Sequence, residues 1–388
     1  MLLLCQGRTA YNGPIEEVPT YFEKCGYPIP NFTNPAEFVL GYVNTDFAQN
    51  EGDVERQLAI VHSSWTNSER ARTEKRERAE ARARRELHGG IGDQPMNGSG
   101  NPMLAVIITL VRRSFIKSYR DIIAYDIRII MYLGLALMMG TVWLRLEPTQ
   151  DNIQSFINAI FFGGAFMSFM AVAYIPAFLE DHAIFVREQA SGFYGPTAFM
   201  LANFIIGIPY LFAISLAFSL VVYWLSNFRS SGGAFFVWTA WLFLDLIAAE
   251  SLVVLISSLM PIFVVALAGT AFANGLWMCT GGFLVTPQTL NAFWRYLFHY
   301  IDYQSYVFEG MMVNEFGNRN YTCASAEDGT CSCMYDSKLA HHCLIEGVAV
   351  LDRYGFQTKQ VGNSIAIMLG IIAGYRALGW LVLFVKTR

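Results

Sequence analysis

Long uncharged runs dominate the second half of the chain. Residues 251–294 contain no charged side chain. About 20 apolar residues span the roughly 30 Å hydrocarbon core of a bilayer, so this run is too long for one crossing. The pair Met260-Pro261 divides it, because proline lacks a backbone N–H and disfavours helix in the residue before it. The pattern therefore predicts the end of one membrane-spanning helix, a short turn, and a second complete span.

The same criterion, applied to the whole sequence, predicts an all-α polytopic membrane protein. We expect six spans within residues 127–388, at about 129–144, 156–179, 198–225, 234–259, 262–284 and 361–385. The first is short, and Arg128 and Arg145 at its ends are expected to extend their charges to the lipid head groups.

Residues 103–126 are expected to precede the spans as an amphipathic connecting helix. Basic side chains from Arg112 to Arg120 alternate there with apolar ones, a pattern typical of a helix at the membrane surface. Lys and Arg favour the cytosolic side. Six crossings return the chain to the side on which it started, so both termini are predicted to be cytosolic and the loop 287–360 external.

Residues 1–60 have the pattern of a small soluble piece. A strand is expected at 2–11, followed by a turn and two short helices. The second helix has a good start, with Asn34 as N-cap and Pro35 in its first turn. The piece is too small to build its own core, so we interpret it as the tail end of a larger α/β domain.

Residues 61–102 are predicted to be a charged and flexible linker. Acidic and basic residues alternate between 69 and 86, and Glu74 and Arg78 are spaced to pair on a helix. The absence of a heptad pattern excludes a coiled coil. Two interpretations stay open: a solvated linker, which we favour, or a basic segment attracted to anionic lipid.

The composition of the chain and the motifs that it lacks exclude several classes of function. Hydrophobic residues make up 54% of the chain and charged residues 15%, against about 25% charged in ordinary globular chains. The net charge is −4 with no basic field, so nucleic acid is not expected as a partner. No Gly-x-x-x-x-Gly-Lys-Ser/Thr sequence occurs, and ATP hydrolysis by this chain alone is not expected. We see no metal-ligand cluster or nucleophile–base pair within the spans, so no metal or catalytic residue is predicted.

The external loop 287–360 has its own chemistry. Its first part, 290–313, is aromatic and amphipathic and is expected to lie along the membrane surface or dip into it. Its second part holds four cysteines, and in an oxidising compartment these suggest one or two disulfides with the pairing open. The four are Cys323, Cys331, Cys333 and Cys343. Zinc binding with His341 or His342 is the competing interpretation, and Asn320 begins a glycosylation sequon.

Three charges fall inside predicted spans: Asp245, Glu250 and Arg376. A lone charge at the bilayer centre costs about 2.5–3.5 kcal/mol on insertion scales. Glu250 and Arg376 lie at equal depths from the cytosolic ends of their helices, so we expect them to form an intramembrane ion pair. Asp245 is expected to hydrogen-bond to a neighbour or to be protonated, with a proton relay as the alternative.

Several stretches carry a resemblance to a known family. They are Gly7-Arg8-Thr9-Ala10-Tyr11-Asn12-Gly13-Pro14, Asn34-Pro35-Ala36-Glu37-Phe38, Arg112-Arg113-Ser114-Phe115, Phe185-Val186-Arg187-Glu188 and Asn314-Glu315-Phe316. In this order they resemble the G-subfamily of ABC transporters, the white/brown and pleiotropic-drug-resistance-like half-transporters, and especially the fungal members. The resemblance implies a type-2 ABC permease fold in which most of an upstream nucleotide-binding domain is missing.

The resemblance also implies roles for individual residues. Phe169, Asn274 and Met278 would line a substrate cavity, although Phe169 has ordinary packing and Asn274 a helix–helix hydrogen bond as the alternative. Phe283 and Leu284 would form an apolar plug between inner and outer cavities. The loop between spans two and three, with Arg187 and Glu188, would dock on the nucleotide-binding domain; a solvated surface pair is the alternative.

The function implied is that of the transmembrane domain of an ATP-driven exporter of hydrophobic or amphipathic molecules or lipids. ATP and magnesium would be bound by the missing domain or by a partner. A homo- or heterodimer in the plasma membrane, surrounded by lipid, would complete the pathway. The alternative is a non-transporting membrane scaffold or receptor that uses the external loop for recognition, and a membrane enzyme is the weakest interpretation.

Overall fold

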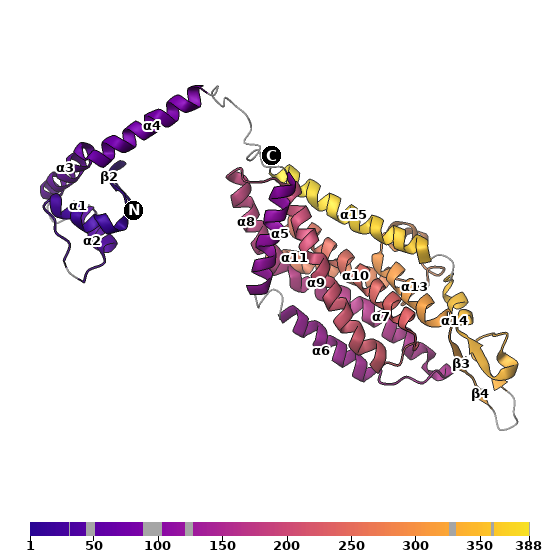
Figure 1. Ribbon diagram of the computed structural model, residues 1–388. Helices are drawn as coiled ribbons and strands as arrows, with labels where there is room; N and C mark the ends of the chain where they lie inside the picture. Colours follow the sequence, from indigo (N-terminus) through magenta and orange to yellow (C-terminus); the bar gives the residue numbers. More distant parts are fainter. Residues whose placement is uncertain are drawn as a thin grey trace. The chain divides into compact units, whose positions relative to one another are not determined.

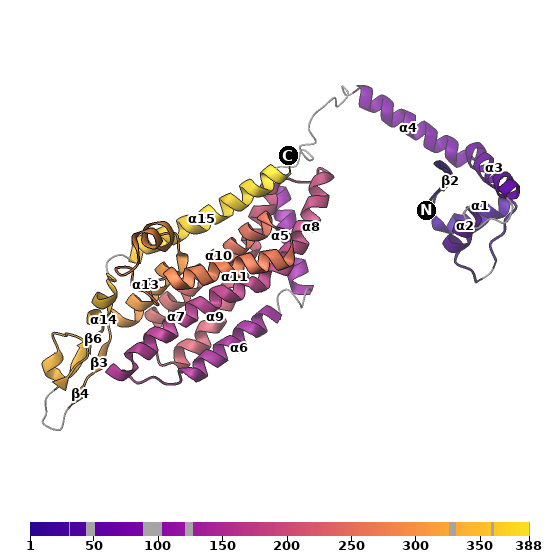
Figure 2. The same ribbon diagram turned by 180° about the vertical axis from the view of Figure 1, so that it is seen from behind.

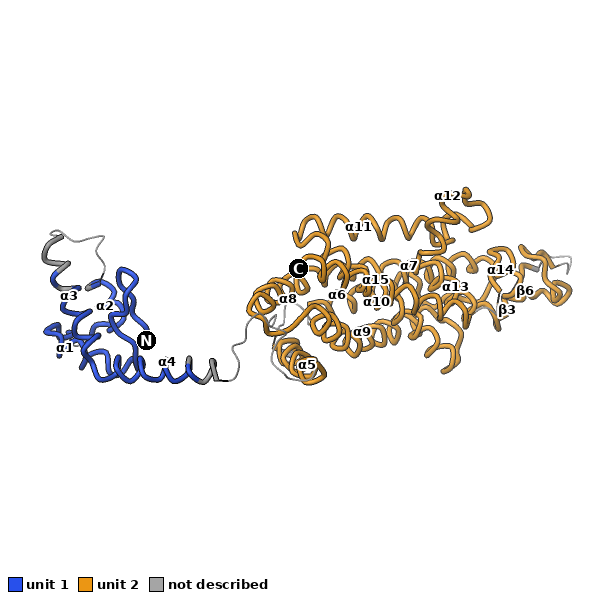
Figure 3. The backbone as a smooth tube through the Cα atoms, turned by 90° about the horizontal axis from the view of Figure 1, so that it is seen from above, with its two compact units in different colours: residues 1–95 blue, residues 96–388 orange. Residues whose placement is uncertain are grey.

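The computed structural model describes residues 1–30, 32–43, 51–87, 103–120, 127–325, 331–357 and 361–387. It divides into two compact units, Met1–Pro95 and Met96–Arg388, which are coloured separately in Figure 3. Each unit is described by itself below.

The first unit is a small α/β piece. Its elements are β1 (Leu2–Cys5), β2 (Arg8–Asn12), a 3₁₀ turn (Ile15–Glu17), α1 (Val18–Lys24), α2 (Pro35–Val43), α3 (Glu51–Asn67) and α4 (Glu69–Leu87). The strands pair antiparallel, and the predicted single strand 2–11 is therefore a hairpin. Its turn is made by Gln6 and Gly7, both with positive φ. The predicted start of α2 is confirmed, because the Asn34 side chain accepts from the Ala36 amide at 3.0 Å.

A small apolar core holds this first unit together. Phe22 of α1, Val39 of α2 and Val61 of α3 are all fully buried, and Trp65 of α3 lies against Tyr11. The expectation that the piece builds no core of its own was wrong, because α3 supplies the missing apolar face. The predicted linker is helical as far as Leu87, and its Glu74–Arg78 pair is formed.

The second unit is almost entirely helical. Its longer helices are α5 (Met103–Arg120), α6 (Ile127–Val142), α7 (Ile153–Met170), α8 (Ile175–Ala190), α9 (Pro196–Leu225), α10 (Gly232–Leu259), α11 (Phe263–Thr280), α13 (Tyr303–Phe316), α14 (Gly347–Tyr354) and α15 (Val361–Lys386). Short helical turns are η3 (Gln150–Asn152), η4 (Ala171–Tyr174), α12 (Ala292–Trp294), the π-helical η5 (Arg295–His299) and η6 (Ala340–His342). The strands are β3 (Asn320–Thr322), β4 (Ala324–Ser325), β5 (Cys331–Ser332) and β6 (Leu344–Glu346), with β3 paired to β6 and β4 to β5.

The predicted fold class is confirmed. Within the described residues, five helical stretches are long and apolar enough to cross a membrane: Gln150–Ala190, Pro196–Leu225, Gly232–Leu259, Phe263–Thr280 and Val361–Lys386. The shorter α6 is the sixth, as its 16 residues suggested. The second span is longer than predicted, because η4 joins α7 to α8 without a break. The fifth ends at Thr280, just before Gly282, whose φ of +92° turns the chain.

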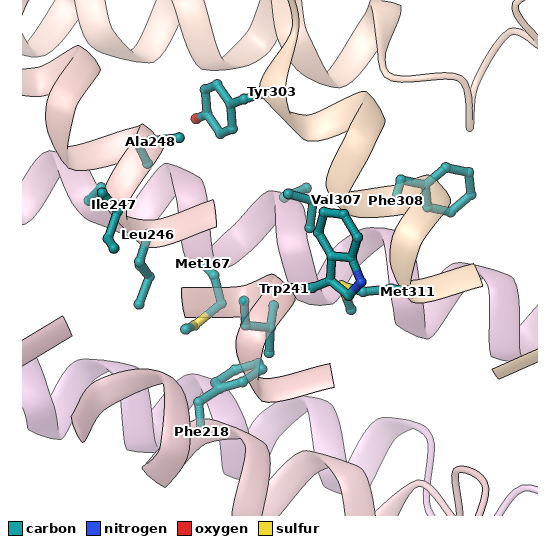
Figure 4. Close-up of a cluster of buried hydrophobic side chains, with 14 of the residues drawn as sticks. Met167, Phe218, Trp241, Leu246, Ile247, Ala248, Tyr303, Val307, Phe308 and Met311 are labelled. Atoms are coloured by element: carbon teal, nitrogen blue, oxygen red, sulfur yellow. The ribbon is translucent and has the colours of Figure 1, made fainter. Parts of the chain in front are cut away.

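Helix α10 lies at the centre of the bundle, with 72% of its most apolar stretch buried. Figure 4 shows part of this core, with side chains from α7, α9, α10 and α13, among them Met167, Phe218, Trp241 and Met311. Helix α13 belongs to the interior. A Cβ on Gly310 would lie 2.1 Å from Cε2 of Trp241, so only glycine allows this approach. Of the two positions expected for 290–313, the one along the membrane surface does not fit α13, because this helix packs inside the bundle.

The two ends of the bundle differ in character. Figures 1 and 2 both place α5, α8 and the last turns of α15 at one end, and α14 with β3 and β4 at the other. Figure 3 shows α11 along one flank of the unit and α5 along the opposite flank. Helix α5 begins at Met103 as predicted and ends at Arg120, and residues 121–126 of the predicted connecting helix lie outside the described residues. It packs on α9 through a small cluster of Leu110, Ala198 and Ala202.

Candidate functional site

A buried ion pair joins α6 to α10. Nη2 of Arg128 lies 2.8 Å from Oε2 of Glu250, and each side chain is 2% exposed. Three tyrosine rings surround the guanidinium, with centroids 5.3–5.8 Å from Cζ: Tyr132, Tyr174 and Tyr210. Arg128 was expected at the head groups, and the structure instead places it in the interior, where Glu250 compensates its charge.

Arg376 of α15 enters the same layer of the bundle. Its Nε donates to Oγ of Ser251 at 2.9 Å and its Nη1 to Oδ1 of Asn203 at 3.0 Å. The predicted Glu250–Arg376 pair was therefore wrong, because the Glu250 carboxylate is taken by Arg128. Depth was estimated correctly, since Arg376 meets the residue next to Glu250. Neighbours on a helix point about 100° apart, however, and depth alone does not give that direction.

A chain of polar contacts continues from this layer to η4, α7 and α9. Nδ2 of Asn203 donates to the Tyr174 hydroxyl at 2.7 Å. Asp245, further along α10, accepts from Oγ of Ser168 at 2.7 Å and is fully buried. The expectation that Asp245 bonds to a neighbour fits this contact. Polar groups inside a membrane domain are costly unless paired, so these contacts fix the relative rotation of the helices.

Sequence reasoning missed Arg128 and Asn203 as members of this layer. The signal for Arg128 existed, since it is the basic residue nearest to the first span on its cytosolic side. An arginine at a helix end ordinarily extends to the head groups, and we applied this rule to Arg128 instead of considering an ion pair with Glu250. Nothing in the sequence distinguished Asn203 from other polar residues near helix ends.

The end of the bundle with α5 and α8 carries a charged clamp. Nη1 of Arg113 lies 2.6 Å from Oε1 of Glu188, and Nζ of Lys117 lies 2.8 Å from Oδ1 of Asp181 and 3.2 Å from Oε1 of Glu180. These contacts join the connecting helix to the end of the second span.

Glu188 has a further partner in Tyr194, which follows α8. The Tyr194 hydroxyl donates to Oε2 of Glu188. Burial raises the pKa of this hydroxyl, and the neighbouring carboxylate raises it further, so the tyrosine keeps the proton that it donates. The carboxylate is thus held on two sides by groups of its own unit.

The predicted loop with Arg187 and Glu188 is helical in the structure, because α8 extends to Ala190. Glu188 faces the connecting helix and is occupied. Arg187 is exposed, and it is therefore the member of the pair that is open to another domain. The predicted docking role stays a prediction. In the structure Glu188 contacts the connecting helix, and Arg187 is exposed.

The residues expected to line a cavity occupy different surroundings. Phe169, near the end of α7, is 41% exposed, and Met278 on α11 is partly buried. Asn274 is 1% exposed, and its Oδ1 accepts from the Tyr303 hydroxyl at 2.8 Å. Asn274 therefore makes the helix–helix contact that was one of its two interpretations.

The two plug residues also separate. The ring of Phe283 stacks on Phe161 of α7 at a centroid distance of 4.0 Å and meets Phe308 of α13 edge-on. Leu284 is 58% exposed. Phe283 thus anchors the end of α11 within the unit, while Leu284 is free to meet lipid or a second subunit.

Two disulfides close the segment that follows α13. Cys323 pairs with Cys333 and Cys331 with Cys343, which confirms that all four cysteines are used. The zinc interpretation loses its thiolates, and His341 and His342 pack against each other instead. Asn320 is exposed on β3, as a glycosylation acceptor must be. Two further Asn-x-Ser/Thr sequons occur in the sequence, at Asn31 and Asn97, and both asparagines lie outside the described residues.

The Asn314-Glu315-Phe316 sequence ties this segment to the bundle. Nδ2 of Asn314 donates to the Ala234 carbonyl at 2.9 Å, and Glu315 accepts from the Arg229 amide at 2.8 Å and pairs with Arg319. Burial raises the pKa of the Glu315 carboxyl even beside Arg319. The motif therefore fastens the disulfide segment to the turn between α9 and α10.

Comparison with known proteins places this arrangement in a family. A model described as "ABC-2 type transporter" matches residues 105–316. ABC transporter G family member 1 of Petunia hybrida is 30% identical over 336 residues, covering 84% of this chain and 52% of that protein. ABC transporter G family member 5 of Arabidopsis thaliana is 23% identical over 396 residues, covering 99% of this chain and 59% of the relative. The chain thus spans about half the length of the relatives that it matches.

Proposed function

Because this chain belongs to the ABC-2 type transporter family and is the transmembrane domain of a G-type ABC transporter, we propose that it forms half of an export pathway. The pathway would move hydrophobic or amphipathic molecules by alternating access. The observation that supports this most directly is the weak burial of α11. Only 28% of its most apolar stretch is covered within the unit, so the helix keeps an apolar face for a second subunit, a substrate or lipid.

A homo- or heterodimer follows from this proposal. The exposed residues Phe169, Phe272 and Leu284 lie on α7, on α11 and just beyond α11, and two such faces would enclose an apolar cavity between them. Met278 is partly exposed on the same helix. Cavities that hold small molecules are mostly apolar with few polar groups, and this composition fits hydrophobic substrates without selecting one.

The charged clamp between α5 and α8 supports the coupling part of the proposal. A nucleotide-binding domain that moves α5 would also move α8, because Arg113 and Lys117 hold three carboxylates of that helix. The α8 helix continues into α7 and the core, so a push at one end would reach the layer of Arg128, Glu250 and Arg376. ATP and magnesium would be bound by a domain of the same polypeptide or of a partner.

The test uses the native protein isolated from its own membranes. We expect ATP photolabelling of the complex that contains this chain, and ATPase activity that rises when hydrophobic substrates are added. An intact mass measured on the same sample tells whether the ATP domain is part of the same polypeptide. ATPase activity that no candidate substrate stimulates would contradict export. It would favour a scaffold or receptor, for which the disulfide segment offers a compact external surface.

The finer assignments stay predictions. The fungal type rests on the resemblance alone, and the relatives reported above are plant proteins. Location in the plasma membrane, cytosolic termini and an external disulfide segment are consistent with each other, since both disulfides need an oxidising compartment. Protease protection of tagged termini in sealed vesicles would test this orientation.

A further inference from the structure

A cavity lies at the end of the bundle that carries the disulfides, which is the end opposite to the charged clamp between α5 and α8 (Figure 1). It has a volume of about 280 Å³ and lies between η5, α13, the residues after α14 and the first turns of α15. Figures 1 and 2 both place α13, α14 and the start of α15 side by side. The residues that matter for its chemistry are His299, Tyr300, Tyr306, Glu309, Phe356 and Ser364.

Within the described part of the chain, the acidic side chain of this cavity has no Lys or Arg beside it. Glu309 of α13 is partly buried, and among the described residues its carboxylate accepts one hydrogen bond, a long contact of 3.4 Å from Oγ of Ser364. Among the described residues, no Lys or Arg forms an ion pair with it. Burial raises the pKa of its carboxyl, as expected for a carboxylate that has lost water without gaining a cation.

His299 does not supply the missing positive charge. Its Nδ1 lies 2.8 Å from the Thr280 carbonyl oxygen. A carbonyl only accepts, so Nδ1 donates its proton there and a neutral ring presents Nε2 as an acceptor. Burial lowers the pKa of the imidazole, which favours this neutral form. The ring therefore adds a second acceptor beside the carboxylate.

Aromatic residues, Tyr300, Tyr306 and Phe356, make up much of the remaining lining. The Tyr306 hydroxyl donates to the Tyr300 carbonyl oxygen at 3.0 Å, which ties the two residues together. Phe356 is fixed by stacking on Tyr354 and by the edge of Phe308. Gly355, with φ of +76°, turns the chain at the end of α14 and directs Phe356 to this position.

We propose that this cavity is a binding site for a small organic cation, a quaternary or alkylated ammonium group. The faces of aromatic rings attract such cations, and a nearby carboxylate adds Coulomb attraction. Ligand cavities in proteins usually measure about 300–1,000 Å³, so a volume of about 280 Å³ suits a head group rather than a drug-sized molecule. The site is independent of the proposed export and needs no ATP.

The clamp between α5 and α8 makes an instructive contrast. A cavity of about 300 Å³ lies there too, lined by Arg113, Lys117, Asp181 and Glu188. Its cations and carboxylates are already paired with each other, so a charged ligand would have to replace existing partners. The cavity beside Glu309 has no such pairing among the described residues and leaves its charge for a ligand.

The test measures thermal unfolding of the full chain, purified in detergent, with benzyltrimethylammonium as the probe. A ligand that binds only the folded state raises its stability with concentration. We expect stabilisation by this cation and not by its uncharged isostere neopentylbenzene. Glu309→Gln should weaken the apparent affinity roughly tenfold, because the charge is lost and the shape kept. Glu147→Gln, an exposed glutamate on another loop, is the matched control and should change nothing.

Aromatic variants give a second line of the test. Tyr306→Phe keeps the ring and should keep binding, whereas Tyr306→Leu should weaken it several-fold. Equal stabilisation of the wild type and Glu309→Gln, or equal effects of the cation and its isostere, would overturn the proposal. If Glu309→Gln does not fold, a photoreactive aryl azide bearing a trimethylammonium group is applied to the wild type. Labelled peptides from 299–309 and 354–367 support the site, and labelling elsewhere contradicts it.

The cation has two sources, a soluble amine or the choline head group of a phospholipid. Nanodiscs of a choline lipid are therefore compared with nanodiscs of a diacyl lipid that has an uncharged sugar head group. Weaker binding of benzyltrimethylammonium in the choline lipid identifies the lipid as the competitor. Equal binding in both identifies a soluble amine. Both results support the site.

Discussion

Helices α10 and α11 follow each other in the chain, and both are apolar enough to cross a membrane, yet they lie in opposite surroundings. Of the most apolar stretch of each, 72% is buried in α10 and 28% in α11. Of these two helices, the one with charges is the buried one, because Asp245 and Glu250 lie in the interior, whereas Phe272 of α11 is 72% exposed. In a bilayer, lipid accepts apolar side chains and rejects charges, and the difference in burial between α10 and α11 follows this rule.

The largest effect on stability is expected when one charge is removed from the ion pair that joins α6 to α10. Arg128→Gln or Glu250→Gln alone should cost about 3–5 kcal/mol, because each leaves its partner buried and uncompensated. The double variant should be much milder. Thermal unfolding and the folded fraction after size-exclusion chromatography measure this.

Two double-mutant cycles distinguish the observed Arg128–Glu250 pair from the Glu250–Arg376 pair that was predicted from depth. Glu250→Gln combined with Arg376→Gln should show far less recovery than Glu250→Gln combined with Arg128→Gln, because Arg376 hydrogen-bonds to Ser251 and Asn203. Strictly additive losses for Arg128 and Glu250 would show that the two side chains are not coupled.

The second prediction concerns the close approach of α13 to α10. Gly310→Ala places a methyl group against the ring of Trp241 and should destabilise the protein by about 1–3 kcal/mol, the usual cost of overpacking. Gly275→Ala on α11 is the control, because a Cβ there meets nothing within 4 Å. Equal thermal stability of the two variants would contradict the packing described for α13.

The third prediction tests the polar contact that connects α11 to the interior. Tyr303→Phe removes the hydrogen bond to Asn274. Bonds of this kind between helices in membranes contribute about 0.6 kcal/mol on average, and rarely above about 1.7. We expect a small loss in unfolding temperature, with α10 unaffected. Asn274→Ala in the Tyr303→Phe background should then cost little more, and a large further loss would place Asn274 in another role.

How far the sequence predicted this structure depends on the kind of question. The length of the uncharged runs predicted all six spans, because the thickness of the hydrocarbon core sets the number of apolar residues that every crossing needs. Pairwise contacts were harder. Depth placed Arg376 beside α10, but the direction around the helix axis, which decides between Glu250 and Ser251, depends on packing. Helix α13 was missed as a core element because Gly310 and Glu315 look like surface residues in the sequence. Their burial is explained only by their contacts with distant residues, Trp241 for Gly310 and Arg229 for Glu315.

The last and smallest expected effect on stability concerns the exposed face of α11. Phe272→Ala should change the unfolding free energy by no more than about 0.5 kcal/mol, since an exposed side chain loses few contacts. If this face meets a second subunit, as proposed, the same change should lower the dimer fraction measured by native mass spectrometry. Phe236→Ala on α10 is the matched control, because Phe236 is 67% exposed but lies at the beginning of the central helix. Dimer loss only in the Phe272 variant would identify α11 as the interface. Equal dimer fractions in both variants would mean that lipid covers the face, and the apolar side chains of α11 would then need no partner other than the bilayer.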